Sequence, residues 1–464
     1  MRKRTPTLLL LLLAFAGTVV VGPAVAPPSV AEGDNRPNFL LIVADDMAAS
    51  DLRWMPRTRR VLQSHGVKMT DFLSNHPVCC PARAEILTGQ YAHNNGVYHN
   101  GGPRGGFKAH DPNHTIATWL QEAGYQTAFV GKYLNGYYGH HGVVPGWTEF
   151  NPTTKGQYAP YGFSALDNGN EHVVESLYTA DWVKRETSRY ISQFSDAGKP
   201  FFIYASQLAP HGMHVKGEWV NPIPAQRHSR LFPKALPPSL KSPSFNVKSY
   251  LSNRREVFRR NAVRLHRARV RSLQAVDEAT VAAVKALREA GELDNTYIIF
   301  TSDNGFLIGE HRFVGKLTPY EQSLKIPMLV RGPGLAQGVK RSATGSLIDL
   351  APTFLDLAGA RATVPTDGRS LMPVLKGVGK GARYTLVQAG DNKAMWSWRG
   401  VRTKRYTWVR HRGGHQELYD LRRDPHQMNN VVDDVDYARV GARLRVKFTA
   451  LRACSGVACR QAGR

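Results

Sequence analysis

Four short apolar segments, each followed by residues that can carry chemistry, limit what this chain can fold into. The first, residues 38–44, reads NFLLIVA and leads into Asp45 and Asp46. The other three are residues 127–130 before Lys132, 201–205 before His211, and 297–301 before Asp303 and Asn304. Short apolar runs bounded by polar residues are typical of strands buried on both faces. Open α/β sheets bind ligands at the carboxyl ends of their strands, so these polar residues are functional candidates.

Helical periodicity appears between the apolar segments. The clearest case is an apolar stripe that ends before Gly291 and consists of Leu273, Val276, Thr280, Val284 and Leu287. A spacing of three or four residues, followed by glycine, predicts an amphipathic helix and its end. Alternation of strands and helices predicts an α/β fold with a large, mostly parallel central sheet flanked by helices.

The pattern changes after about residue 382. Short β-type runs, separated by glycine and basic residues, cover residues 384–388, 394–401 and 406–410. They predict a smaller C-terminal antiparallel sheet followed by a helix. We therefore expect a catalytic α/β domain over residues 32–382 and a C-terminal subdomain over residues 383–464.

The first 31 residues read as a secretory signal peptide. Arg2, Lys3 and Arg4 precede an apolar run, and small residues follow it. Cleavage after Ala31 is favoured, because Pro27 would obstruct a cut after Ala26. A membrane anchor is the alternative, but the purely apolar run is shorter than the roughly 20 residues that a span needs. We expect a secreted protein with no stable membrane insertion after the signal is removed.

The chain is strongly basic, with 61 Lys and Arg against 36 Asp and Glu and a formal charge of +25. Loss of Arg2, Lys3 and Arg4 with the signal peptide would leave +22. This excess favours anionic partners such as sulfated or carboxylated glycans. Nucleic acid is not expected as a partner, since no reading module or aromatic stacking platform accompanies the charge.

A cysteine motif is the most specific signal in the sequence. Residues 79–83 read Cys-Cys-Pro-Ala-Arg, and Leu-Thr-Gly follows at residues 87–89. Adjacent cysteines cannot easily bridge each other, and an exposed pair would be hazardous in an oxidising compartment. Either the pair has a special chemical fate or it is simply two small buried residues.

The spacing Cys-x-Pro-x-Arg-x-x-x-Leu-Thr-Gly resembles the signature of the sulfatase family, part of the alkaline phosphatase superfamily. The resemblance implies that a formylglycine-generating enzyme oxidises Cys79 to formylglycine during export, and that its hydrate is the nucleophile. Cys80 occupies a variable position, and Ala82 replaces a common serine. A thiolate attacking sulfur would leave an adduct with no simple exit, whereas the hydrate has a second hydroxyl with which to expel sulfate.

The same resemblance implies a divalent-metal site. Its ligands would be Asp45, Asp46, Cys79 as formylglycine, Asp303 and Asn304. Oxygen ligands with three negative charges suit a hard cation; calcium is favoured and magnesium is the alternative.

Basic residues match the family positions that neutralise sulfate and hold the formylglycine hydrate: Arg83, Lys132, His211 and Lys316. Fixed cations stabilise negative charge that develops on sulfate oxygens in a dry site. His311 is a further candidate, for leaving-group protonation or substrate contact, with a structural role as its alternative.

One departure from the family pattern indicates a branch. Arylsulfatases usually carry Lys-x-His after the corresponding strand, but here Leu134 follows Lys132 at the histidine position. This feature, with residues 91–97 and 293–297, resembles N-acetylglucosamine-6-sulfatases and the extracellular heparan endosulfatases. A sulfated sugar of the N-acetylglucosamine-6-sulfate type is therefore the implied substrate.

Two further features lie outside the motif. Residues 254–271 hold eight arginines and one acid, Glu256; a solvated helix face explains them, with a polyanionic-glycan subsite as the alternative. Cys454 and Cys459 are predicted to form a short disulfide near the C-terminus.

Two other functions compete with a secreted sulfatase. A phosphoester or phosphonate hydrolase of the same superfamily would share the metal and the fold. A non-catalytic relative that binds polyanionic glycans is disfavoured, because every charged position of the expected site is present.

Overall fold

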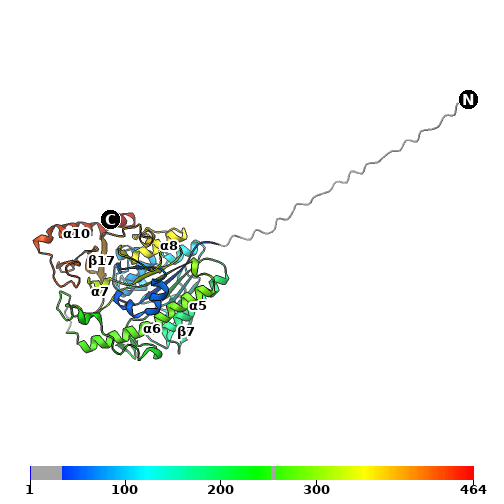
Figure 1. Ribbon diagram of the computed structural model, residues 1–464, viewed down its shortest axis with the longest axis horizontal. Coiled ribbons are helices and arrows are strands. Elements are labelled where there is room, and N and C mark those ends of the chain that lie inside the picture. Colours follow the sequence, from blue (N-terminus) through cyan, green and yellow to red (C-terminus); the bar gives the residue numbers. More distant parts are fainter. Residues whose placement is uncertain (2–33, 252–255) are drawn as a thin grey trace. The chain divides into compact units, whose positions relative to one another are not determined.

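A central sheet of eight strands organises the chain (Figure 1). The structure, a computed structural model, describes Met1 and residues 34–251 and 256–464. The predicted signal peptide lies outside the described residues. In spatial order the strands are β15 (Val339–Arg341), β2 (Val67–Met69), β14 (Met328–Arg331), β11 (Thr296–Ser302), β1 (Asn38–Ala44), β8 (Phe201–Ser206), β4 (Gln126–Gly131) and β5 (Glu149–Pro152). Only β14 runs antiparallel to its neighbours. The prediction of a mostly parallel sheet is confirmed, and all four predicted strands are present within one residue of their expected bounds.

Two layers of helices cover the sheet. On β1, Leu40 and Ile42 face α5 (Thr179–Asp196) and α6 (Arg259–Glu289), whereas Phe39 and Leu41 face α2 (Cys79–Thr88), α4 (Ile116–Glu122) and α8 (Leu350–Ala358). Successive side chains of a strand point to opposite faces, so a continuous apolar run is buried on both sides. The other short helices are α1 (Pro56–Thr58), α3 (Ala92–Asn95), α7 (Glu321–Leu324) and α9 (Met372–Leu375).

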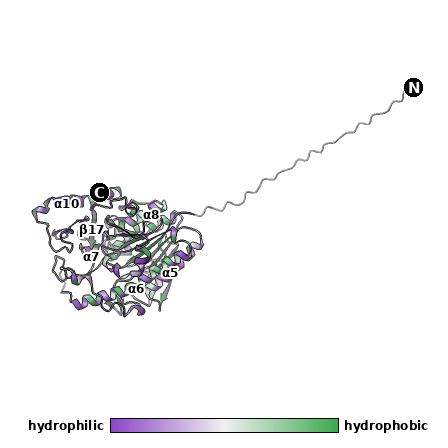
Figure 2. Cartoon of the chain, viewed as in Figure 1, coloured by the Kyte–Doolittle hydropathy of each residue, from purple (hydrophilic) through white to green (hydrophobic). Residues whose placement is uncertain are grey.

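The predicted amphipathic helix is α6, which begins fourteen residues before the stripe that identified it. Leu273, Val276, Val284 and Leu287 are buried against the sheet, and the helix ends before Gly291, where φ is positive. Both hydrophobic and hydrophilic colours alternate along its ribbon (Figure 2). Among the described residues, no helix combines the length and apolarity that crossing a membrane requires.

Short strands outside the main sheet form hairpins and edges. They are β3 (Phe72–Leu73), β6 (Phe163–Asp167), β7 (Asn170–Val174), β9 (Met213–Val215), β10 (Glu218–Val220), β12 (Leu307–Ile308), β13 (Val314–Gly315) and β16 (Gly345–Ser346). The β9–β10 and β12–β13 hairpins lie in the connections that follow β8 and β11, so they border the carboxyl ends of those strands.

The C-terminal residues form the predicted antiparallel sheet, with four strands, and two helices follow it where one was predicted. The strands are β17 (Thr385–Gly390), β18 (Trp396–Arg402), β19 (Tyr406–His411) and β20 (Gln416–Asp420), followed by α10 (Ala438–Leu451) and α11 (Val457–Ala462). The predicted β-type runs do not include β20, because its charged residues, such as Glu417 and Asp420, are buried through ion pairs that a local pattern does not show.

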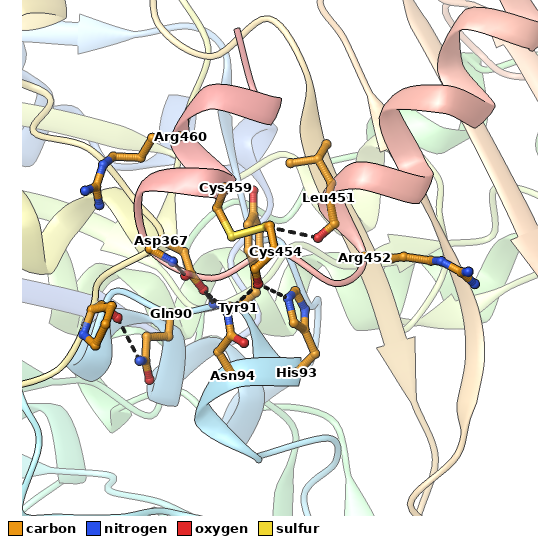
Figure 3. The surroundings of a disulfide bond; sticks show 12 residues. Gln90, Tyr91, His93, Asn94, Asp367, Leu451, Arg452, Cys454, Cys459 and Arg460 are labelled. Carbon is orange, nitrogen blue, oxygen red and sulfur yellow. Dashed lines mark hydrogen bonds between the residues drawn. A yellow bond between two sulfur atoms is a disulfide. The ribbon is translucent and has the colours of Figure 1, made fainter.

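The predicted disulfide between Cys454 and Cys459 is present (Figure 3). The residues around it belong partly to α3: His93 Nε2 lies 2.9 Å from the Cys454 carbonyl oxygen, and Asn94 Nδ2 donates to the same oxygen at 2.9 Å. Asp367 accepts from Asn94 and from the Gly456 backbone N–H. Part of the segment that resembles one sulfatase branch therefore holds the C-terminal loop.

A buried arginine joins the C-terminal sheet to the rest of the protein. Arg402, at the end of β18, contacts Asp71 Oδ2 at 2.6 Å and Glu321 Oε2 at 2.9 Å. The Arg402 side chain is 2% exposed. Burial acts to raise the pKa of Asp71, but the Arg402 guanidinium holds it below its usual range. Burying these charges costs desolvation free energy, which their mutual attraction offsets only while both the cation and the carboxylates are present.

We predict that Arg402→Ala lowers the free energy of unfolding by about 3–5 kcal/mol, because it leaves two carboxylates without their buried cation. Urea unfolding followed by circular dichroism measures the change. Arg185→Ala is the matched control: Arg185 is 56% exposed beside Glu186, and its loss should cost less than about 1 kcal/mol. Equal losses in the two variants would contradict the assigned role of Arg402.

Candidate functional site

The carboxyl ends of four parallel strands bring the candidate residues together. Asp45 and Asp46 follow β1, Lys132 follows β4, His211 follows β8, and Asp303 with Asn304 follows β11. The register aligns these ends, since Ala44 pairs with Ser302 and both Val43 and Gly131 pair with Ser206. Apart from His211, which is slightly exposed, these residues are almost completely buried. Residues scattered over some 260 positions of sequence therefore meet at one edge of the sheet.

Cys79 lies at the centre of this group. It is the first residue of α2, after Val78 in an extended conformation, so its side chain is at the positive end of the helix dipole. Its Sγ lies 2.9 Å from Lys316 Nζ, 3.3 Å from Lys132 Nζ and 3.4 Å from Asp45 Oδ1. An oxygen placed near Sγ would contact two ammonium groups at once.

Arg83 follows Cys79 by one helical turn and connects three strands. Its Nε donates to Asp303 Oδ2 at 3.0 Å, and its Nη1 donates to the Lys132 carbonyl at 2.7 Å. Nη1 also donates to Ser206 Oγ at 2.6 Å. Because Arg83 lies four residues after Cys79, α2 presents both to the same edge of the sheet.

Asp46 forms the second half of the cluster. It pairs with Lys316, accepts from Asn304 Nδ2 at 2.7 Å, and lies 3.5 Å from His211 Nε2. Its backbone φ is +67°, a conformation that an aspartate adopts at some cost. Arg269 of α6 donates to the Asp46 carbonyl at 2.6 Å and to Asp51 at 2.8 Å, and so supports that conformation.

Neighbouring charges set the protonation of the site. Burial alone would raise the pKa of both Asp45 and Asp46. The charge of Lys132 holds the pKa of Asp45 below its usual range, and that of Lys316 does the same for Asp46, with a smaller contribution from His211 in each case. Burial, with the Asp45 charge, raises the pKa of Asp303 to about 6 and that of the Cys79 thiol to about 11. An unmodified Cys79 is therefore a protonated thiol and a poor nucleophile at neutral pH.

The donor set fits a hard divalent cation. Ligand atoms of Asp45, Asp46, Cys79 and His211 all lie within 4.8 Å of one another. Asn304 Oδ1 is buried and accepts no hydrogen bond from the described residues, although its amide nitrogen is fully used. A buried carbonyl oxygen without a donor is costly, and a cation beside the carboxylates would satisfy it. Cys79 is counted here for the oxygen that would replace its sulfur.

His311 is not brought into the cluster. Its ring stacks on Tyr320 with centroids 3.9 Å apart, and its backbone N–H donates to the Ser244 carbonyl at 2.8 Å. Burial lowers the pKa of His311 to about 4. These contacts favour the structural alternative for this residue.

A cleft of about 620 Å³ opens next to Asp46, His211 and Lys316. Sequence reasoning missed several of its lining residues, among them Asn135, Tyr158, Trp219 and Arg269. Tyr158 lies under Lys132 Nζ at 4.6 Å and stacks on His211 at 4.8 Å, while Trp219, on β10, is 61% exposed. Among these four, Asn135 could have been found from the sequence, because it lies three residues after Lys132. Arg269 lies within an arginine-rich segment whose composition is typical of a solvated helix face.

The other described arginines of that segment are consistent with a solvated helix face. Arg254 and Arg255 lie outside the described residues, and Arg259, Arg260 and Arg264 are exposed on α6. Arg267 and Arg271 donate to backbone carbonyls of the segment before the helix, at 3.1 and 2.6 Å. Leu134 at the arylsulfatase histidine position is 1% exposed and packs in the hydrophobic core, so it offers no polar group to the cleft.

Comparison with protein families identifies the family of the chain. The model described as Sulfatase matches residues 37–360, which include every residue of the cluster. The chain belongs to the sulfatase family. A second model, N-sulphoglucosamine sulphohydrolase, C-terminal, matches residues 309–454. This sulfatase is accordingly a sulfuric ester hydrolase, as predicted.

Three relatives of this sulfatase illustrate the range of similarity. An arylsulfatase of Volvox carteri is 30% identical over 93% of this chain and 77% of its own length. An N-acetylglucosamine-6-sulfatase of Capra hircus is 29% identical over 95% of this chain and 87% of its own. An extracellular sulfatase SULF-1 homolog of Drosophila melanogaster is 32% identical over 74% of this chain, which spans only 31% of that longer protein.

A solved structure shares the fold of this sulfatase. The protein BT4656, in complex with its substrate D-glucosamine-2-N,6-O-disulfate, superposes with a TM-score of 0.77 and 23% identity. The match covers 92% of this chain and 98% of that one. At this identity the match establishes the fold alone.

Cys80 points away from the cluster, toward Asn135, whose backbone N–H lies 3.0 Å from its Sγ. Burial raises the pKa of the Cys80 thiol to about 12.

We predict that iodoacetamide at pH 8 leaves Cys80 unlabelled in the native sulfatase, because the thiol is protonated and inaccessible. Peptide mass spectrometry measures labelling, and the urea-unfolded chain, in which Cys80 should react, is the control. Labelling of the native protein would contradict this placement.

Proposed function

We propose that this chain is a secreted sulfatase that hydrolyses sulfate esters of a sulfated sugar, of the N-acetylglucosamine-6-sulfate type. One observation carries the catalytic part: Cys79 Sγ lies within 3.3 Å of two lysine ammonium groups at the meeting point of four strands. A position that is buried, cationic and adjacent to an open cleft suits a nucleophile acting on an anionic ester.

Cys79 would act after conversion to formylglycine by a formylglycine-generating enzyme during export. The hydrated aldehyde would supply a hydroxyl nucleophile that the protonated thiol lacks. Lys132 and Lys316 would hold that hydroxyl, since they already contact Sγ. Arg83, fixed by Asp303 and the Lys132 carbonyl, would keep Lys132 and α2 in place.

Asp45, Asp46, Asp303 and Asn304 would hold the divalent cation, with Cys79 as formylglycine completing the set. Calcium is our assignment and magnesium the alternative. The cation would neutralise charge on the sulfate oxygens. The buried Asn304 Oδ1 supports this site, because no described residue donates to it.

His211 and Lys316 border the cleft and would face the substrate. The Lys316 side chain is 14% exposed, whereas Lys132 is fully buried, so Lys316 is the cation that an incoming sulfate reaches first. Burial lowers the pKa of His211 to about 4, with Asp46 opposing the shift, so the free imidazole is neutral at pH 7. Nδ1 lies 2.6 Å from the Gly212 carbonyl oxygen and so carries the proton of the neutral ring. Nε2 is therefore free to accept a proton at the cleft.

The substrate class and the location rest on the relatives. The similarity to an N-acetylglucosamine-6-sulfatase over nearly the whole chain supports a sulfated amino sugar. Similarity to an extracellular sulfatase, together with the N-terminal sequence pattern, supports secretion. Trp219, exposed at the cleft, offers an aromatic face for a sugar ring.

We predict that tryptic peptide 69–83, from protein secreted by its native host, has the mass of the aldehyde or its hydrate at Cys79. Cys79→Ala should abolish hydrolysis of an aryl sulfate, whereas Cys80→Ala should retain the modification and most of the activity. Turnover of the matched aryl phosphate in preference to the aryl sulfate would instead support a phosphoester or phosphonate hydrolase. An unmodified Cys79 in a preparation that binds sulfated glycans without turnover would favour a non-catalytic relative.

We also predict that calcium raises the thermal stability of the chelator-treated protein, by about 2.7 kcal/mol when the ion is roughly a hundredfold above its Kd. The loss of this shift in Asn304→Ala, measured by calorimetry without any substrate, would locate the ion at the cluster. Asn246→Ala, which removes an amide elsewhere, is the control and should keep the shift. A calcium shift that survives Asn304→Ala would place the ion elsewhere.

A further inference from the structure

A second cavity, of about 540 Å³, lies where the C-terminal sheet meets the edge of the main sheet. The described residues that line it include no carboxylate but five cations, namely Lys380, Arg383, Lys404, Arg405 and Arg443. We call it the basic cavity. None of these residues belongs to the catalytic cluster or its cleft.

The charge of the basic cavity is largely uncompensated. Arg405 is neutralised by Asp420, which it contacts at 2.7 Å. The other four cations form no ion pair with the described residues; Lys404 Nζ donates to Ser342 Oγ at 3.0 Å. Like charges that converge on one space repel each other, and this repulsion is relieved when an anion enters.

Backbone contacts between two segments hold the walls of the basic cavity in place. Thr344 and Gly381 form a parallel β-bridge at its base, and the Ala382 N–H donates to the Thr344 carbonyl at 3.0 Å. Gly381 has φ +70°, and a Cβ there would lie 2.3 Å from the Thr344 oxygen, so only glycine allows this approach. Cations lie over the tyrosine rings of the lining, Arg383 over Tyr384 at 5.3 Å and Arg405 over Tyr406 at 4.9 Å.

The basic cavity is on the same edge of the main sheet as the catalytic cluster. Ser342 follows β15, which runs parallel to β2 and, across the antiparallel β14, in the same direction as β11 and β1. β15 is four strand positions from β1, a lateral separation of roughly 19 Å. Trp398 of β18 contacts the Leu317 carbonyl, next to Lys316, and Thr403, directly after β18, lines the cavity. The five residues of extended chain from Trp398 to Thr403 cover roughly 17 Å.

We propose that the basic cavity is a second, non-catalytic binding site for the sulfate and carboxylate groups of a polyanionic glycan chain. This proposal rests on the proposed function, since the glycan is the polymer whose other sugars occupy the catalytic cleft. Arginine forks bind sulfate and carboxylate at two points, and lysines add point charges. A chain that reaches both sites is held more tightly than a single sulfated sugar.

The test uses a triple variant of the full secreted chain, Lys380→Gln with Lys404→Gln and Arg443→Gln. These three side chains are exposed and form no ion pair with the described residues, so the fold should persist. We expect its affinity for a heparin octasaccharide at low salt to fall about tenfold, the loss expected from three exposed ion pairs. Hydrolysis of a small aryl sulfate should be unchanged, whereas KM for a sulfated polysaccharide should rise.

The matched control is Lys199→Gln with Arg288→Gln and Arg361→Gln. It removes the same charge from exposed positions that do not line the cavity, and should change octasaccharide affinity less than twofold. Equal losses in both triple variants, or no loss in either, would overturn the proposal. So would equally tight, equally sensitive binding of a DNA oligonucleotide. Failure to hydrolyse any aryl sulfate would count against the proposed function alone, because octasaccharide affinity is measured without turnover.

Discussion

The balance of buried charge at one edge of the main sheet is the constraint on which the rest of this structure depends. Asp45, Asp46 and Asp303 are almost fully buried, and carboxylates in such a place need cations. Three are supplied, by α2, by the end of β4 and by the loop after β13: Arg83, Lys132 and Lys316. Arg83 and Lys132 are themselves too buried to stand alone. Fold and site are therefore coupled, because each ion pair joins two elements.

The parallel sheet makes this concentration of charge geometrically inevitable. Aligned strands end side by side, so the residues after β1, β4, β8 and β11 must meet. Gly131 shows how close that approach is, since a Cβ there would lie 1.8 Å from the Ser206 carbonyl oxygen. Its φ of +106° then turns the chain so that Lys132 enters the cluster.

The C-terminal sheet contributes to the site without supplying a cluster residue. Trp398 of β18 donates through Nε1 to the Leu317 carbonyl at 2.9 Å, and the Leu317 N–H donates to the Pro77 carbonyl at 3.2 Å. Lys316 is therefore fixed between the C-terminal sheet and the segment before Cys79. Arg402 links the same strand to Glu321, four residues after Leu317. The smaller sheet acts as a support for the one cluster lysine that is open to the cleft.

The four core strands, the amphipathic stripe of α6, the cysteine motif and the charged residues after each strand are all visible in the amino-acid sequence. These features are local: apolar runs, periodicity and fixed spacing are visible without knowing what packs against what. Four features depend on packing between distant segments: the contacts of Cys79, the burial of Arg269 and Arg402, the strand β20, and the position of His311 outside the cluster. Those outcomes depend on partners such as Asp51, Glu321 and Tyr320, which lie far away in sequence. A charged residue is buried or exposed according to whether such a partner arrives, and no local pattern records that.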